Sequence, residues 1–271
     1  IAPGKGVQKL RQSRYEEFTI HGASSFAPVL YCNTDEQGQF FFATEKNTWL
    51  QKPAGAQKIS DMQPSVRRPV FYWNNSAWTY RDYNTLENGR GQTISLQQPA
   101  LSNSSFQPSA NSIIDSDGNL ILTGTHTSVI RPDLSVVSAD VPYFCDNAVV
   151  AGKGDYWFFC RNNDVLHYQL EGNALRLRSK IAVKELSPRF AMHWNKDSFW
   201  IATRYLGIVL ASVKDNQFRE LGRITRSSGL SNDFVEALLR VAPGQVGAGT
   251  ASGVDLISIN GSDTLIEHVA S

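Results

Sequence analysis

The chain has 271 residues, 41% of them hydrophobic, and its charged residues nearly cancel to a net charge of +1. A chain of this length buries a full-sized core, and we expect one domain over residues 1–271. Lys and Arg are dispersed, without the basic stripe that nucleic acid or an anionic membrane surface requires, so we expect no nucleic-acid binding by this domain.

One short pattern recurs along the chain: an apolar strand that ends at Thr, Tyr or Cys and is followed by a polar corner. The six strand-ending residues are Thr44, Tyr80, Thr125, Cys160, Thr203 and Thr250. They lie about 41 residues apart on average, which is the repeat length of a four-stranded propeller blade. The pattern predicts an all-β protein, a β-propeller of four-stranded blades, with six blades favoured and seven as the alternative.

The blades are placed in chain order by their turns, which are rich in Asp, Asn and Gly. They are predicted near residues 26–62, 67–100, 110–140, 143–185, 188–227 and 231–270. The N-terminal segment 14–20 resembles the last strand of the fifth blade. It is therefore predicted to be an outer strand that either closes the ring against the sixth blade or belongs to an incomplete seventh blade. Little helix is expected, and even residues 233–240 are predicted to form a strand, because Pro243-Gly244 ends them.

The corners after the six strands are predicted to gather at one mouth of the central channel. Mixed charges with amide, imidazole and phenol groups at one mouth suit a polar small molecule or an oligosaccharide. The alternative for each of these residues is a solvated turn. The candidate ligand-binding residues are Glu45, Lys46, Arg81, His126, Arg161, Asn162, Arg204 and Tyr205.

Two of the three cysteines have a notable spacing. If Ala151-Gly152-Lys153-Gly154 is a hairpin turn centred between Gly152 and Lys153, Cys145 and Cys160 face each other across the ladder. That register allows a cross-strand disulfide, and the alternative is two buried thiols. A disulfide would favour a periplasmic or extracellular location. No run of about 18 apolar residues and no signal-like segment is present, so we expect a mature or excised piece, joined to a membrane only through segments outside this sequence.

Motifs for catalysis, metals and cofactors are absent from the sequence. The five histidines have no second His or Cys at metal-ligand spacing, and there is no P-loop, dinucleotide fingerprint or nucleophile elbow. We therefore expect no metal, no cofactor and no catalytic residue. Glu45 and Asp82 are the only carboxylates of the corners that would serve as an acid/base pair, which keeps a glycan lyase or hydrolase as a minor alternative.

The last repeat, residues 227–258, carries a family resemblance. It resembles the repeat of the two-component regulator propeller family, although Gly247 stands where that family usually has Trp. The residues that match the family pattern are Gly229, Leu230, Asn232, Gly244, Gly249, Thr250, Gly253 and Val254.

The resemblance implies a propeller outside the cytoplasmic membrane, in a bacterial signalling protein of a family in which some members respond to glycan fragments. The implied function is a ligand-sensing input domain, with its ligand at the channel mouth or at the interface of a homodimer. The alternative is a non-catalytic propeller that serves as a scaffold for a partner protein.

Overall fold

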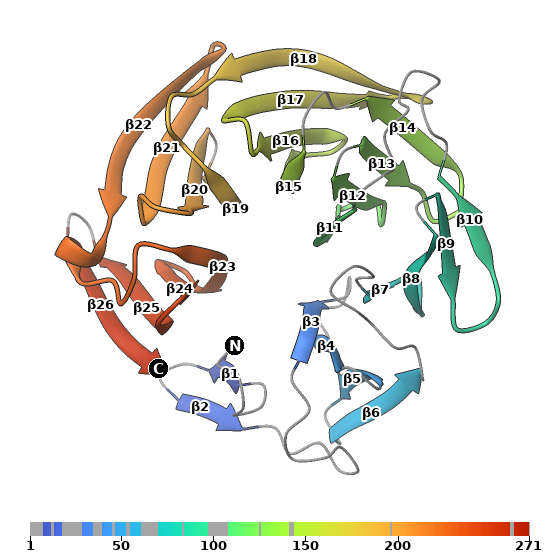
Figure 1. Cartoon of the computed structure of the whole chain (residues 1–271), viewed down its shortest axis with the longest axis horizontal. Coiled ribbons are helices and arrows are strands. Elements are labelled where there is room, and N and C mark those ends of the chain that lie inside the picture. The colour runs from blue at the N-terminus through green and yellow to red at the C-terminus, as the bar shows by residue number, and fades with distance from the viewer. Residues whose placement is uncertain are drawn as a thin grey trace.

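The protein is a β-propeller. The computed structural model describes residues 8–11, 14–17, 29–34, 40–44, 47–52, 55–60, 70–82, 84–96, 108–124, 126–140, 144–195, 197–260 and 263–270. Within these residues, six antiparallel four-stranded sheets stand around a central axis (Figure 1). The one helix among them is a single 3₁₀ turn, η1 (Arg226–Ser228). The predicted all-β fold and the six four-stranded blades are confirmed.

The strands of the first three blades follow one another from the channel outward in chain order. Blade one contains β3 (Val29–Thr34), β4 (Phe40–Thr44), β5 (Thr48–Lys52) and β6 (Gly55–Ser60). Blade two contains β7 (Val70–Trp73), β8 (Ser76–Asp82), β9 (Thr85–Asn88) and β10 (Thr93–Ser95). Blade three contains β11 (Pro108–Ile114), β12 (Leu120–Gly124), β13 (His126–Ile130) and β14 (Val136–Asp140).

The next three blades have the same order and longer strands. Blade four contains β15 (Cys145–Gly152), β16 (Asp155–Cys160), β17 (Asp164–Glu171) and β18 (Ala174–Ala182). Blade five contains β19 (Pro188–Asn195), β20 (Ser198–Thr203), β21 (Ile208–Lys214) and β22 (Gln217–Ile224). Blade six contains β23 (Val235–Ala242), β24 (Gln245–Thr250), β25 (Gly253–Asn260) and β26 (Asp263–Ala270). The segment 233–240 thus lies largely in a strand, as predicted.

The N-terminal strands form a separate, two-stranded sheet. β1 (Gln8–Arg11) pairs with β2 (Arg14–Glu17), and the pair lies between β26 and β3 on the ring (Figure 1). Among the described strands, the sheet of blade six contains only β23 to β26. Of segment 14–20, the described part, Arg14–Glu17, pairs with β1, and both predicted roles of the segment stay predictions. Residues 18–20 lie outside the described residues.

The core consists of the contacts between neighbouring blades. The middle strands are covered on both faces, and all five residues of β12 are buried. Phe159 and Val165 of blade four, for example, pack in one cluster with Ile201 and Val209 of blade five. The outer strands instead alternate buried and exposed residues, and charged side chains and bulges protect their edges, as in β18.

Polar contacts also join the blades at the end of the channel opposite the corners. The buried carboxylate of Asp115 in blade three accepts a hydrogen bond from the Tyr156 hydroxyl of blade four at 2.6 Å. The same carboxylate accepts the backbone N–H groups of Asp117 and Asn119, which closes the turn after β11. Trp73 of blade two donates its indole N–H to the carbonyl of Gly118 at 2.7 Å. This turn therefore ties three consecutive blades together.

The hairpin between β15 and β16 corrects one sequence-based prediction. Its turn is Lys153-Gly154, where Gly154 has a φ of +64°, so the predicted centre between Gly152 and Lys153 is wrong by one residue. Register shifts at Ala151 and at Asp146 then move the pairing by one residue each, and Cys145 faces Cys160 after all. The two cysteines are joined by a disulfide. The pairing follows from two register shifts that the sequence pattern did not reveal.

Candidate ligand-binding site at one mouth of the channel

The corners of blades four to six are held by the same backbone hydrogen bond. In each blade, the residue after the second strand donates its N–H to the carbonyl of the residue before the innermost strand. The three bonds are Arg161 to Phe144 (2.9 Å), Arg204 to Ser187 (3.0 Å) and Ala251 to Phe234 (3.0 Å). They place the corners and the linkers between blades at one end of the channel. We call this surface the blade 4–6 rim (residues 144–146, 161–164, 183–189, 204–207, 231–236 and 250–253).

Hydrogen bonds also join the segments of the rim from one blade to the next. Asn163, in the corner of blade four, binds the linker to blade five: its backbone carbonyl accepts the N–H of Val183 at 3.0 Å, and its Oδ1 accepts the N–H of Ser187 at 2.6 Å. Gly207, in the corner of blade five, donates its N–H to the carbonyl of Asp233 in the next linker at 3.0 Å. The rim is therefore one bonded surface, which fixes the backbone from which its side chains project before any ligand binds.

A β-bulge at the start of each innermost strand brings a charged residue to the rim. The register shifts by one at the second residue of β15, β19 and β23, and these residues are Asp146, Arg189 and Glu236. A bulge turns a side chain away from the alternation of its strand. The same position in three successive blades thus carries a carboxylate, a guanidinium and a carboxylate.

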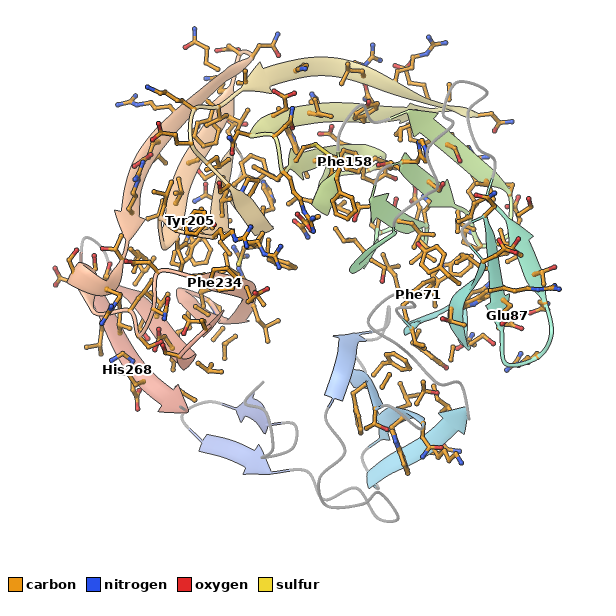
Figure 2. All side chains as sticks on the ribbon, in the orientation of Figure 1. Phe71, Glu87, Phe158, Tyr205, Phe234 and His268 are labelled. Atoms are coloured by element: carbon orange, nitrogen blue, oxygen red, sulfur yellow. A yellow bond between two sulfur atoms is a disulfide. The ribbon has the colours of Figure 1, made fainter. Side chains whose placement is uncertain are left out.

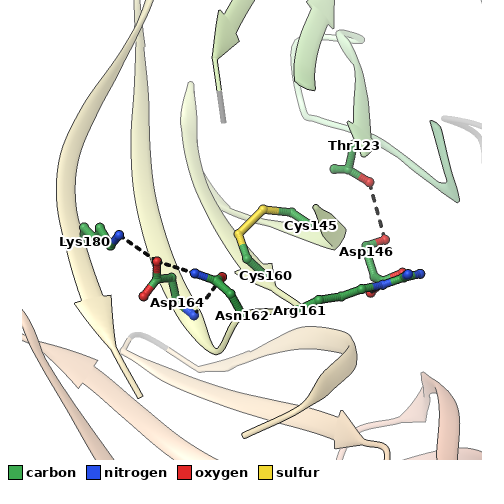
Figure 3. The surroundings of a disulfide bond; sticks show 8 residues. All are labelled: Thr123, Cys145, Asp146, Cys160, Arg161, Asn162, Asp164 and Lys180. Carbon is green, nitrogen blue, oxygen red and sulfur yellow. Dashed lines mark hydrogen bonds and ion pairs between the residues drawn. A yellow bond between two sulfur atoms is a disulfide. The ribbon is translucent and has the colours of Figure 1, made fainter. Parts of the chain in front are cut away.

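In blade four, the corner arginine is bound by a carboxylate of its own blade. Arg161 donates from Nε to Oδ2 of Asp146 at 2.6 Å and from Nη2 to Oδ1 at 2.7 Å, and these bonds raise the pKa of Arg161 above its ordinary value. Its guanidinium also lies 4.1 Å from the ring centroid of Phe144. Figure 3 shows the Cys145–Cys160 disulfide beside this pair. Each cysteine is the sequence neighbour of one partner, so the covalent bond fixes the strands that carry the ion pair.

In blade five, the arginine of the bulge pairs with the next blade. Arg189 lies 3.1 Å from Glu236, Nη2 to Oε2, and its guanidinium carbon is 6.0 Å from the ring centroid of Phe234. This contact joins the innermost strands β19 and β23 across the boundary between blades five and six.

The corner arginine of blade five has different surroundings. The guanidinium of Arg204 lies 5.5 Å from the ring centroid of Tyr205, which is 66% exposed. No ion pair involves Arg204 among the residues that the structure describes. Figure 2 shows Tyr205 and Phe234 on the facing parts of blades five and six. A charged fork and an open aromatic ring are therefore presented together at the channel mouth.

The candidate residues predicted from the sequence are only partly brought together. Arg161, Arg204 and Tyr205 lie on the blade 4–6 rim. Asn162 lies there too, but its side chain donates to Asp164 at 2.7 Å and braces the turn. His126 is 6% exposed at the start of β13, so its side chain belongs to the interior of blade three. Arg81 is exposed near the end of β8 in blade two, and Glu45 and Lys46 lie outside the described residues.

Sequence reasoning missed five residues of the rim: Phe144, Asp146, Arg189, Phe234 and Glu236. Phe144 and Phe234 each lie immediately before the innermost strand of their blade. Asp146, Arg189 and Glu236 are each the second residue of that strand. An alignment of the repeats on their first strands, in addition to their second strands, would have found them.

The carboxylates proposed for acid/base chemistry gain no support. The backbone N–H of Asn84 donates to Asp82 at 2.8 Å and holds the pKa of that carboxyl below its ordinary value, whereas a general acid needs a raised pKa. Glu45, the other member of the pair, is not among the described residues. Within the described part of the chain, no group of three His, Cys, Asp or Glu side chains is placed to hold a metal ion, and no helix is long and apolar enough to cross a membrane.

Comparison with known proteins supports the fold. No family model and no curated protein sequence matches the chain. A streptogramin B lyase structure aligns with a TM-score of 0.69 at 13% identity over 95% of this chain and 87% of that one. A protein from Lactobacillus plantarum aligns at 0.62 and 9% identity (92% and 86%), and the WD40 repeats of RRP9 at 0.57 and 9% (82% and 73%).

These neighbours are β-propellers with different functions, from a lyase to WD40 repeats. At such low identities they show the fold alone, and a propeller fold does not determine a function. The function has to be argued from the rim.

Proposed function

We propose that this propeller is an extracytoplasmic ligand-binding input domain of a bacterial signalling protein, and that it binds a polar small molecule or a glycan fragment at the blade 4–6 rim. The observation that carries the proposal is the repetition of one device. Three guanidinium groups, each within 6.0 Å of an aromatic ring centroid, project from one hydrogen-bonded surface.

Such a surface is suited to binding. Guanidinium groups make strong, directional hydrogen bonds to polar ligands, and an adjacent ring gives a flat apolar surface for the rest of the molecule. Asp146 and Glu236 each bind an arginine of the rim, so they hold guanidinium groups in position and do not form a pair of catalytic carboxylates. The proposal therefore includes no reaction step.

The disulfide supports the location. Disulfides persist in oxidising compartments such as the periplasm and the extracellular space, and they are rare in the cytosol. Cys145, a residue of the rim, is bonded to Cys160. A periplasmic or extracellular propeller that binds its ligand at this mouth is consistent with the sensor role that the repeat pattern implies.

A second candidate function, a scaffold for a partner protein, has one observation in its favour. Leu177, Leu221 and Leu265 are exposed on β18, β22 and β26, which are the outermost strands of three successive blades. Exposed apolar side chains form a protein interface when a partner covers them together. Such a partner would bind the outer wall of the ring, away from the rim.

Thermal unfolding in the presence of oligosaccharides and small polar metabolites tests the proposal. A ligand at 100 times its dissociation constant stabilises the folded protein by about 2.7 kcal/mol, which raises the melting temperature measurably. The double variant Arg161→Ala/Arg204→Ala is expected to fold and to lose this response. Arg219→Ala on the outer strand β22 is the matched control and is expected to keep it. If no compound raises the melting temperature and a partner binds through the exposed leucines, the scaffold replaces the sensor.

A further inference from the structure

We infer that the ligand carries a carboxylate group, that it is an acidic saccharide, and that Arg204 and Tyr205 form the subsite that binds it. This inference rests on the proposed function and makes its ligand class specific. It comes from a comparison of two equivalent corners, in blades four and five.

The two corners are built alike. Arg161 and Arg204 both follow the second strand of their blade, and both donate their backbone N–H to the residue before the innermost strand. In both blades the second residue of that innermost strand is bulged. The two arginines therefore occupy the same place relative to the bulge of their own blade.

The residue at the bulge differs. In blade four it is Asp146, whose two carboxylate oxygens accept two hydrogen bonds from Arg161. In blade five it is Arg189, whose own partner is Glu236 of blade six. Blade five thus lacks the carboxylate that satisfies the corner arginine in blade four. The structure assigns that missing role to a carboxylate of the ligand.

The ion pairs of the rim arginines agree with this assignment. Arg161 and Arg189 are matched by Asp146 and Glu236, whereas Arg204 has no ion pair among the described residues. Asp233 is the acidic residue of the linker that follows blade five. Its Oδ1 accepts the backbone N–H of Arg226 at 2.8 Å. A planar guanidinium fork fits a carboxylate with two parallel hydrogen bonds, which an ammonium group does not offer.

The neighbouring ring points to a sugar. Tyr205 is 66% exposed, and it is the aromatic residue most open to solvent among the described part of the chain. The flat apolar face of a pyranose packs on such a ring, while its hydroxyl groups stay in water. A uronate residue has both features in one unit, because its carboxylate is attached directly to the ring. The expected pose has the carboxylate on Arg204 and the sugar face on Tyr205.

Isothermal titration calorimetry tests the inference with matched pairs of probes. The probes are short oligosaccharides of galacturonate, mannuronate, guluronate and hyaluronan, each compared with its methyl ester, which keeps the sugar and removes the charge. At least one of the acidic oligosaccharides is expected to bind, and its methyl ester is expected to bind at least tenfold more weakly. Affinity for the acid is expected to fall as salt is added, since the contact is charged and exposed.

Variants then locate the site. Arg204→Ala is expected to weaken binding of the acid at least tenfold and to leave the weak binding of the ester unchanged. Arg204→Lys is expected to recover only part of the loss, because an ammonium group does not reproduce the fork. Tyr205→Ala is expected to weaken acid and ester alike, and Arg219→Ala is expected to bind as the unmodified protein does.

The outcomes separate the inference from the proposed function. Equal binding of an acid and its ester, or unchanged binding by Arg204→Ala, overturns the carboxylate assignment. Binding of a neutral sugar that is lost in Tyr205→Ala would leave the ligand-binding function intact. If no saccharide binds, acidic or neutral, the saccharide inference fails, and a non-saccharide ligand that stabilises the protein through the rim would still support the proposed function.

Discussion

The guanidinium of Arg161 and the carboxylate of Asp146 are joined by two hydrogen bonds, of 2.6 and 2.7 Å. Their sequence neighbours, Cys160 and Cys145, are joined by a disulfide. The ion pair and the disulfide thus hold the same two strands at the same level. The rigidity of the rim in blade four therefore has a covalent and an electrostatic component, which mutations can separate.

The ion pair is expected to contribute modestly to stability. The side chain of Asp146 is 10% exposed and that of Arg161 is 54% exposed, so solvent weakens the attraction. Arg161→Ala is expected to lower the free energy of unfolding by about 1 kcal/mol, and a double-mutant cycle with Asp146→Asn should give a coupling energy of the same size. Urea denaturation measures both. The Arg223–Glu220 pair of β22, whose carboxylate side chain is 38% exposed, is the control, with an expected coupling of about 0.3 kcal/mol, and equal coupling in the two pairs would contradict this prediction.

The disulfide is expected to contribute more. It closes a loop with a sequence separation of 15 residues, for which loop-closure entropy predicts about 3 kcal/mol. Urea denaturation with and without a reductant should show this difference. In the variant Cys145→Ala/Cys160→Ala, the reductant should have no effect, since Cys32 is the only cysteine left. Equal stability of the oxidised and reduced protein would mean that the hydrogen bonds hold the corner alone.

The fold was predictable from the sequence because its signal is repeated. Thr203 and Thr250 close equivalent strands, and one pattern of turns and apolar strands locates every blade. The same alignment placed Arg161 and Arg204 in equivalent corners, since a corner lies at a fixed offset from the strand before it.

The rest of the site depends on features that a strand pattern does not contain. Asp146 and Glu236 reach the rim through β-bulges, and a period of two residues does not show where an extra residue is inserted. The pairing of Arg189 with Glu236 depends on how two blades pack, which is a property of the closed ring. For the same reason the hairpin centre was misplaced, while the register shifts at Ala151 and Asp146 together restored the facing cysteines.

Gly207 is expected to be the most sensitive glycine of the rim. It has a φ of +68°, and a Cβ there would overlap the carbonyl oxygen of Ile224 in the adjacent strand β22. Gly207→Ala is therefore expected to destabilise the protein by about 3 kcal/mol or more, because backbone would have to move.

Two other glycines separate the two causes of the stability loss expected for Gly207→Ala, which are backbone strain and overlap with Ile224. Gly172 also has a positive φ, of +56°, but has open space around it, so Gly172→Ala should cost roughly 1 kcal/mol from backbone strain alone. Gly222 has neither feature, and Gly222→Ala should change stability by less than about 0.5 kcal/mol. Thermal or urea unfolding of the three variants gives the order, and similar losses in Gly207→Ala and Gly172→Ala would show that the strand adapts to a side chain.

The hydrogen bond from Tyr156 to Asp115 makes stability depend on alkaline pH. Burial, and then the hydrogen bond to the Asp115 carboxylate, raise the pKa of Tyr156 above its ordinary value, and burial raises that of Tyr80. A raised pKa in the folded state means that the unfolded chain loses these protons first, from about pH 10 upward. Their contribution to stability is therefore complete below that pH and is lost as the pH rises further.

The variant Tyr156→Phe measures how much Tyr156 contributes to the pH dependence of stability. At neutral pH the variant should be less stable by about 2 kcal/mol, because it lacks a hydrogen bond to a buried carboxylate. Between pH 9 and pH 11 the unmodified protein should lose about 1.4 kcal/mol more than the variant, so the gap between them narrows. The stability difference between the unmodified protein and Tyr80→Phe should also change over this pH range, and this variant keeps the Asp115 contact. Urea denaturation at both pH values provides the comparison, and a gap that stays constant would show that Tyr156 releases its proton equally well in the folded and unfolded protein.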